Sequence, residues 1–137
     1  MAKEILIFGR RVDRTAWLSG TLVSLLVVVA FGLIIGNLVD RAGQNSLLVS
    51  AAISIGLVLG AFIAARKAPR LHIFHGMLTS VAPIALSLFI QLVRVGRGIQ
   101  TVSWLSLVLV FFLAVSLATL GGIAGGRLSP HKGSLFE

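Results

Sequence analysis

The sequence contains no cysteine and few charged residues. The absence of cysteine excludes a disulfide framework, a thiolate metal site and a cysteine nucleophile. Only 12% of the 137 residues are charged, whereas a soluble domain carries about a quarter. Too few polar groups therefore remain to cover a water-facing surface. A mean hydropathy of +1.04 and four long apolar runs predict a polytopic membrane protein instead.

Acidic residues are especially scarce, and none lies inside an apolar run. Proton- and cation-coupled carriers usually place a carboxylate within the membrane, so this distribution disfavours a drug/proton antiporter. The sequence has no H-E-x-x-H motif, no Gly-rich phosphate loop and no plausible Ser-His-acid set. We therefore expect no enzymatic activity and no cofactor. The acidic residues are Glu4, Asp13, Asp40 and Glu137.

The apolar runs predict an all-α fold of four transmembrane helices. These spans cover about residues 17–39, 46–65, 72–93 and 102–124, each long enough to cross a bilayer core at 1.5 Å per residue. Residues 1–14 form a basic N-terminal segment, residues 15–126 the transmembrane domain and residues 127–137 a basic tail. Within the first segment, Ile5–Phe8 is expected to form a short amphipathic turn or helix at the membrane interface. An exposed tail is the alternative.

The distribution of Lys and Arg predicts the orientation. Nine of them fall in the two termini and the loop between spans two and three, and three fall on the opposite side. This asymmetry places both termini in the cytoplasm. The net charge of +8 is explained in the same way, and nucleic acid is not expected as a partner. The basic residues that either hold anionic headgroups or only set the orientation include Arg10, Arg11, Arg14, Arg66, Lys67, Arg70 and Arg127.

Small residues recur at four-residue spacing in spans two and four. Residues four apart share one helix face, and small side chains on such a face allow another backbone to approach closely. The rows predict helix contacts, either with a partner protein or within this chain. They consist of Ala52, Gly56, Gly60 and Ala64 in span two and of Ala114, Ala118, Gly122 and Gly126 in span four.

Span three carries a polar stripe and two histidines. Pro83 removes one backbone hydrogen bond, so a kink is expected near Thr79. A pair of histidines three residues apart could bind metal or sense pH, but no third ligand is near in sequence. The alternative is that His72 and His75 bond to headgroups or to the backbone. The stripe consists of Thr79, Pro83, Ser87 and Gln91.

Two eleven-residue stretches, Leu59–Pro69 and Leu120–Pro130, align without a gap at an offset of 61 residues. In each, an apolar run gives way to small residues, an Arg and then a Pro. Spans two and four cross in the same direction, so the pair predicts a parallel duplication of a two-helix hairpin. Chance similarity between two Gly/Ala-rich helix ends is the competing explanation.

Short motifs in these spans resemble those of a known family of small four-span bacterial membrane proteins. There, span two ends in a G-A-x-x-A-x-R-like stretch, His-Gly often opens span three, and span four ends in G-G-x-x-G-G-x. The corresponding residues are Gly60–Arg66, His75–Gly76 and Gly121–Arg127. The family has no known function, so the resemblance implies topology and no reaction. The longer basic N-terminus of this chain departs from the pattern.

These observations favour a non-enzymatic integral membrane protein. We expect an accessory or assembly subunit that packs through its Gly/Ala faces in a homo-oligomer or a larger membrane complex. The alternative is a small transporter or lipid-handling protein that uses the polar stripe of span three. A membrane-perturbing protein of holin type is a third hypothesis. The expected partners are membrane lipids, anionic headgroups on the cytoplasmic side, and other membrane subunits or a second copy.

Overall fold

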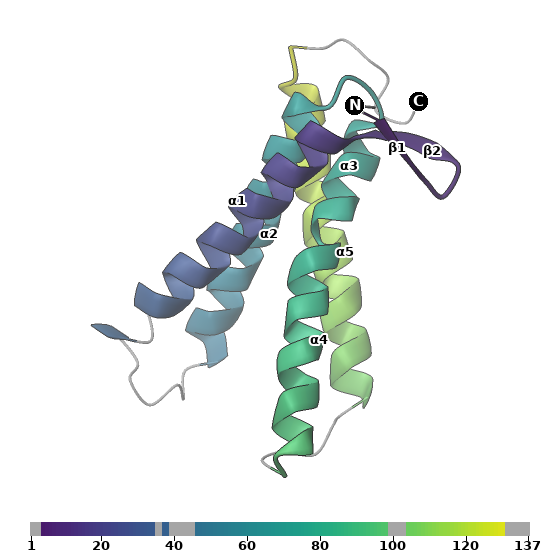
Figure 1. Cartoon of the computed structure of the whole chain (residues 1–137). Helices are drawn as coiled ribbons and strands as arrows, with labels where there is room; N and C mark the ends of the chain where they lie inside the picture. Colours follow the sequence, from purple (N-terminus) through teal and green to yellow (C-terminus); the bar gives the residue numbers. More distant parts are fainter. Residues whose placement is uncertain (1–3, 35–36, 39–45, 99–103, 131–137) are drawn as a thin grey trace.

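The computed structural model describes residues 4–34, 37–38, 46–98 and 104–130. Most of them are helical. The helices α1, α2, α3 and α5 meet at one end of the molecule, and α4 continues from α3 toward the other end (Figure 1). Three helical stretches within this part of the chain are long and apolar enough to cross a membrane: Arg14–Phe31, His72–Phe89 and Leu107–Arg127. The elements are β1 Glu4–Ile7, β2 Arg10–Asp13, α1 Arg14–Ile34, α2 Ser46–Lys67, α3 His72–Thr79, α4 Val81–Gly96 and α5 Trp104–Arg127.

The N-terminal segment departs from the predicted all-α fold. Residues 4–13 form an antiparallel hairpin, in which Ile5 pairs with Val12, in place of the expected amphipathic turn or helix. Phe8 and Gly9 both have positive φ, at 50° and 74°, as a tight two-residue hairpin turn requires. Alternation along the strands leaves Leu6 exposed and buries Val12. The hairpin contacts the helices through Val12 and through Arg10, whose guanidinium lies 5.4 Å from the centre of the Phe74 ring.

The helix boundaries lie close to the predicted spans, with several short extensions and one interruption. The helices α2, α4 and α5 end at Lys67, Gly96 and Arg127, whereas the predicted spans end at residues 65, 93 and 124. The helix α1 begins at Arg14, three residues before the predicted start, because Asp13 caps it. The carboxylate oxygen Oδ1 of Asp13 accepts a hydrogen bond of 2.8 Å from the backbone N–H of Ala16, the usual N-cap arrangement. The predicted loop at residues 40–45 lies outside the described residues, as do residues 131–137 of the tail. The predicted loop at residues 94–101 is wrong in its first part, because α4 continues to Gly96, and residues 99–101 lie outside the described residues.

The helix of predicted span three is interrupted at Ser80, between α3 and α4. Pro83 has no N–H to offer the carbonyl of Thr79, so the helical hydrogen-bond pattern lapses there. The hydroxyl groups of Thr79 and Ser80 instead donate to the carbonyls of Gly76 and Met77, at 2.6 and 2.7 Å. The break lies one residue from the position at which the sequence predicts a kink.

Close packing of α1 against α2 depends on glycine. A Cβ atom placed on Gly60 would lie 2.5 Å from Cβ of Ser24 and 2.7 Å from the carbonyl oxygen of Gly20. A Cβ on Gly56 would lie 2.5 Å from Cγ2 of Val28. The two Gly60 distances require α1 to move, because Cβ of Ser24 and the carbonyl of Gly20 are fixed to its backbone, whereas the Gly56 distance requires at least the Val28 side chain to move. The backbones of α1 and α2 can approach this closely only because residues 56 and 60 lack side chains.

The helix α5 packs against α2 and α3 on two different faces. Gly121 and Gly125 lie against the carbonyl groups of Val58 and Phe62 on α2. Gly122 lies against α3, where a Cβ on Gly76 would be 2.6 Å from the Cα of Gly122. Parallel α2 and α5 therefore bring the two repeated stretches into contact with each other.

The equivalent glycines of the two repeated stretches meet different neighbours. Gly60 contacts α1, whereas Gly121, its counterpart in the alignment, contacts α2. Two hairpins related by a simple rotation would give equivalent glycines equivalent partners. The duplication therefore stays a prediction from the sequence.

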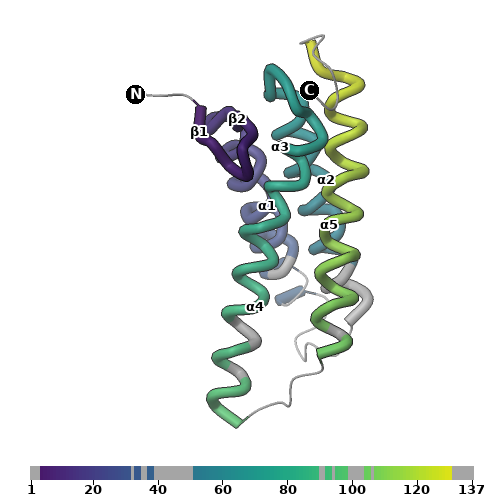
Figure 2. Tube along the Cα trace, turned by 90° about the vertical axis from the view of Figure 1, so that its right-hand side faces the viewer, coloured from purple at the N-terminus to yellow at the C-terminus, as the bar shows by residue number. Residues whose placement is uncertain are grey.

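Beyond this packed region, α4 and the first part of α5 project away from the other helices. Figure 1 shows α4 diverging from α1 and α2, and Figure 2 shows it diverging from α5. No described side chain is buried at positions 85–96 of α4 or 104–113 of α5. We refer to these two stretches as the apolar arm. Its large exposed side chains include Leu86, Leu88, Phe89, Leu92, Val93, Val95, Trp104, Leu105, Val108, Leu109, Val110, Phe111, Phe112 and Leu113.

Candidate functional site

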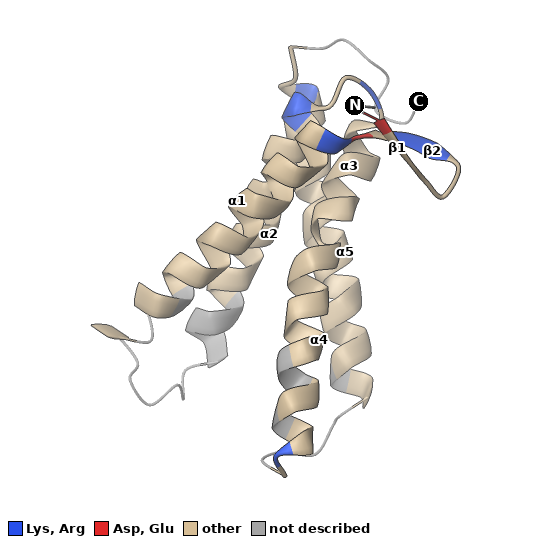
Figure 3. Cartoon of the chain, in the orientation of Figure 1, with Lys and Arg blue, Asp and Glu red and all other residues tan. Residues whose placement is uncertain are grey.

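Most of the described cations gather at one end of the molecule, where α1 begins and α2 and α5 end (Figure 3). We call this the basic end. Arg97, in the turn after α4, lies at the opposite end. All the candidate headgroup residues of the sequence therefore share one end of the fold. They come from β2, from the first residue of α1, from the last turns of α2 and α5, and from the α2–α3 loop: Arg10, Arg11, Arg14, Arg66, Lys67, Arg70 and Arg127.

The C-terminus of α2 is closed by side chains from two other parts of the chain. The ring nitrogen Nδ1 of His72 lies 2.7 Å from the carbonyl oxygen of Ala65, so this nitrogen must carry the proton and donate it. The hydroxyl of Ser129 donates to the carbonyl oxygen of Arg66 at 2.9 Å. These bonds satisfy carbonyl groups that a helix end otherwise leaves without partners. His72 and Ser129 therefore tie α3 and the end of α5 to α2.

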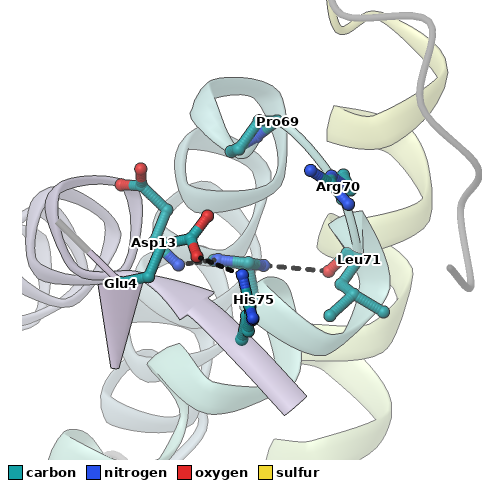
Figure 4. A pocket seen from close by; sticks show the side chains of 7 residues that line it. Glu4, Asp13, Pro69, Arg70, Leu71 and His75 are labelled. Atoms are coloured by element: carbon teal, nitrogen blue, oxygen red, sulfur yellow. Dashed lines mark hydrogen bonds and ion pairs between the residues drawn. The ribbon is translucent and has the colours of Figure 1, made fainter. Parts of the chain in front are cut away.

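His75 joins the N-terminal hairpin to α3. Its Nε2 accepts a 2.8 Å hydrogen bond from the backbone N–H of Asp13, and its Nδ1 lies 3.0 Å from the carbonyl oxygen of Leu71. Figure 4 shows the ring of His75 between these two residues. Because one nitrogen accepts and the other donates, this arrangement requires the neutral imidazole with its proton on Nδ1. The side chain is 1% exposed.

Leu71 is held in a conformation that is unusual for a residue with a side chain. Its φ of 54° lies in the left-handed region, which costs roughly 1–2 kcal/mol for such residues. Its carbonyl oxygen accepts from both the backbone N–H and the ring of His75, each at 3.0 Å. The turn after Pro69 is thus fixed by the first residues of α3.

A small cavity lies between the hairpin and the α2–α3 loop. It has a volume of about 200 Å³, and Figure 4 shows it bounded on one side by Glu4 and Asp13 and on the other by Arg70. The acidic side chains that line this cavity already have partners within the chain. Glu4 forms an ion pair with Arg11 at 3.7 Å, and Asp13 caps α1. The cavity therefore offers little net charge to a ligand.

Both histidines are engaged by backbone groups. No group of three or more His, Cys, Asp or Glu side chains capable of holding a metal is present among the described residues. Both nitrogens of His75 and one nitrogen of His72 are engaged by the backbone, which agrees with the alternative that they bond to backbone groups. The remaining Nε2 of His72 is buried without a partner, and one nitrogen alone cannot hold a metal.

The predicted polar stripe does not converge on a cavity. Thr79 is fully buried and its hydroxyl is taken by the carbonyl of Gly76. Pro83 is buried, whereas Ser87 is exposed. The side chain of Gln91 lies outside the described part of the molecule. Neither the cavity beside Glu4 and Asp13 nor the cavity beside Arg66 and Lys67 is lined by a residue of the stripe.

The predicted small-residue rows lie largely inside the fold. Gly56 and Gly60 face α1, and Gly122 faces α3. Gly126 is half-buried. The remaining members are buried: Ala52, Ala64, Ala114 and Ala118. The chain's own helices therefore account for the glycine contacts that the structure describes.

Three residues that hold the basic end together have no role in the sequence analysis: Asp13, Ser129 and Leu71. An Asp directly before an apolar helical run is a recognisable N-cap signal, so the role of Asp13 was available from the sequence. The Ser129–Arg66 and Asp13–His75 bonds join residues 63 and 62 positions apart, and no local pattern indicates such pairs. Comparisons with models of protein families, with curated proteins and with solved structures find no match for this chain.

Proposed function

We propose that the protein is a non-enzymatic integral membrane subunit, and that it docks to another membrane protein through its apolar arm. One observation carries this proposal. At positions 85–96 and 104–113, no described side chain is buried against the rest of the chain. In lipid, the position of a helix is set by packing against neighbouring helices and not by a hydrophobic force between them. A partner helix lying against the arm would supply the packing that this chain does not.

The contrast with the packed region supports the same reading. Where α1, α2, α3 and α5 pack together, glycines at 56, 60, 121, 122 and 125 bring helices into close contact. The small-residue rows are thus occupied within the chain. The proposal accordingly places the partner surface on bulky side chains such as Phe89 and Phe112, which are 65% and 62% exposed.

The proposal includes four spans in the bacterial inner membrane, with both termini in the cytoplasm. The basic end then lies at the cytoplasmic surface, and Arg97 lies at the opposite surface, as the Lys/Arg asymmetry requires. The helix α2, with 22 residues, supplies the span that accompanies the three apolar stretches. Its two basic residues in the last turn, Arg66 and Lys67, end it at the headgroup level.

Purification of the full chain in a mild detergent, followed by native mass spectrometry, tests the proposal. We expect a complex with a second membrane protein or with further copies of the chain. A variant with Phe89→Ala and Phe112→Ala is expected to release the partner, whereas Leu22→Ala and Leu26→Ala on α1 are expected to retain it. A strictly monomeric wild-type chain, with no co-purifying membrane protein, would contradict the proposal.

A further inference from the structure

A second cavity lies between α1, α2 and Pro130, near the basic end. It has a volume of about 490 Å³ and is open to the surroundings. Val23 of α1 and Phe62 and Ile63 of α2 form its apolar part. Arg66 and Lys67 lie at one end of it. We call it the α1–α2 groove; its lining is completed by Pro130.

The residues of α2 make one end of the groove apolar and the other end cationic. Phe62 and Arg66 are four residues apart, and so are Ile63 and Lys67, so each pair shares one face of the helix. One helical turn is about 5.4 Å. The groove therefore passes from an apolar pair to a cationic pair within a single turn, in the direction of the basic end.

The cations of the groove are not neutralised within the described part of the chain. The ion pair found there joins Arg11 to Glu4, and no acidic residue lines the groove. Nor are Arg66 and Lys67 needed to cap α2. The carbonyl groups of Ala65 and Arg66 already accept hydrogen bonds from His72 and Ser129. Two exposed cationic side chains thus stand beside an apolar surface, and no acidic side chain among the described residues pairs with them.

We propose that the α1–α2 groove binds one anionic phospholipid. Its phosphate lies against Arg66 and Lys67, and the first part of an acyl chain lies along Val23, Phe62 and Ile63. This inference rests on the proposed topology, in which Arg66 and Lys67 lie at the cytoplasmic face, where cationic groups beside membrane helices are suited to anionic headgroups. A zwitterionic choline headgroup would bring its own positive charge to a groove that has no carboxylate to receive it. The site therefore selects phosphatidylglycerol over phosphatidylcholine.

Binding of the two lipids to delipidated full-length protein, measured by native mass spectrometry, tests the charge requirement. We expect phosphatidylglycerol to bind more tightly than phosphatidylcholine. The double variant Arg66→Gln, Lys67→Gln should weaken phosphatidylglycerol binding roughly 30-fold, given the typical contribution of each cation near anionic lipid. The matched control Arg14→Gln, Arg127→Gln removes the same charge from the basic end without altering the groove. An equal loss in both variants, or no loss in the first, would overturn the proposal.

A second pair of variants tests whether the ligand is a lipid or only a phosphate. Ile63→Trp fills the apolar part of the groove, whereas Ile53→Trp adds the same bulk to an exposed position of α2. We expect only Ile63→Trp to weaken phosphatidylglycerol binding. Glycerol 3-phosphate should compete poorly, because it has no acyl chain. Strong competition by glycerol 3-phosphate, together with no effect of Ile63→Trp, would show a simple anion site and refute the lipid assignment. Circular dichroism confirms that each variant retains its helices.

Discussion

At the scale of single residues, the fold depends on a few positions where side chains are either absent or fully engaged. Gly60 is one example of the first kind, because α1 occupies the space where its Cβ would lie. His75 is an example of the second kind, because both ring nitrogens have backbone partners. Substitutions at such positions are expected to cost far more than substitutions at exposed apolar positions of the arm.

Replacing Gly60 by Ala is expected to destabilise the protein by about 1–3 kcal/mol, the usual cost of overpacking. The added methyl group would meet Ser24 and the backbone of Gly20, so α1 and α2 must separate. Gly96→Ala is the matched control, because nothing lies within 4 Å of a Cβ at that position. Unfolding in detergent with increasing SDS measures both variants. Equal stability of Gly60→Ala and the wild type would contradict the close contact of α1 and α2.

Replacing His75 by Phe is expected to release the N-terminal hairpin. The ring volume is nearly retained, but the backbone N–H of Asp13 loses its acceptor. Leaving such a group without a partner costs about 1–3 kcal/mol. Faster hydrogen exchange at the Asp13 amide and faster tryptic cleavage after Arg10 and Arg11 report the release. Thr119→Val, which removes a local hydrogen bond within α5, should leave both rates unchanged.

At the scale of the helices and strands, the break at Ser80 separates a packed segment from a projecting one. Residues of α3 are buried at most positions, whereas α4 is exposed after its first turn. Pro83 lies in the first turn of α4 and accounts for the break, because it has no N–H to donate to the carbonyl of Thr79. The direction of α4 therefore depends on one missing N–H group.

Replacing Pro83 by Ala is expected to join α3 and α4 into one helix and to redirect α4. The native chain has no cysteine, so spin labels on Leu26→Cys and Leu92→Cys report the separation of α1 and α4 cleanly. We expect the distance distribution between these labels to shift in the Pro83→Ala variant. Val81→Ala, also in the first turn of α4, should leave the distribution unchanged. An unaltered distribution in Pro83→Ala would show that the break has another cause.

The sequence predicts the helices well and their contacts poorly. Long apolar runs and flanking polar residues placed helix boundaries such as Ser46 and His72 correctly, because the length of an apolar run is a strong signal. The four-residue strands of the hairpin are too short for periodicity to distinguish them from a turn or a short helix. Helix partners are also undetermined, since a row of small residues permits close approach without specifying which helix approaches. The Asp13–His75 bond illustrates this limit across 62 positions.

At the scale of the whole molecule, the chain combines a compact basic end with a projecting apolar arm. Among the described side chains, the charges lie at the compact end except for Arg97 (Figure 3), and the large exposed apolar side chains continue along the arm. Such a division suits a protein that is anchored at one membrane surface and meets a partner within the membrane. The proposed orientation and the proposed docking surface can be tested separately.

Cysteine labelling tests the orientation. With a membrane-impermeant maleimide, Arg97→Cys is expected to react in intact cells, because its position faces the outside in the proposed topology. Arg14→Cys is expected to react only after the membrane is made permeable. Both side chains are exposed, so access to the reagent depends on the side of the membrane and not on burial. The reverse pattern would invert the topology.

The central claim is that the apolar arm contacts another protein, and site-specific photocrosslinking in native membranes tests it most directly. A benzophenone amino acid at Phe89 or Phe112 would lie on the arm, and one at Leu22 would lie on an equally exposed part of α1. We predict a discrete protein adduct from the two arm positions and only lipid adducts from position 22. Lipid adducts alone from all three positions would contradict the claim.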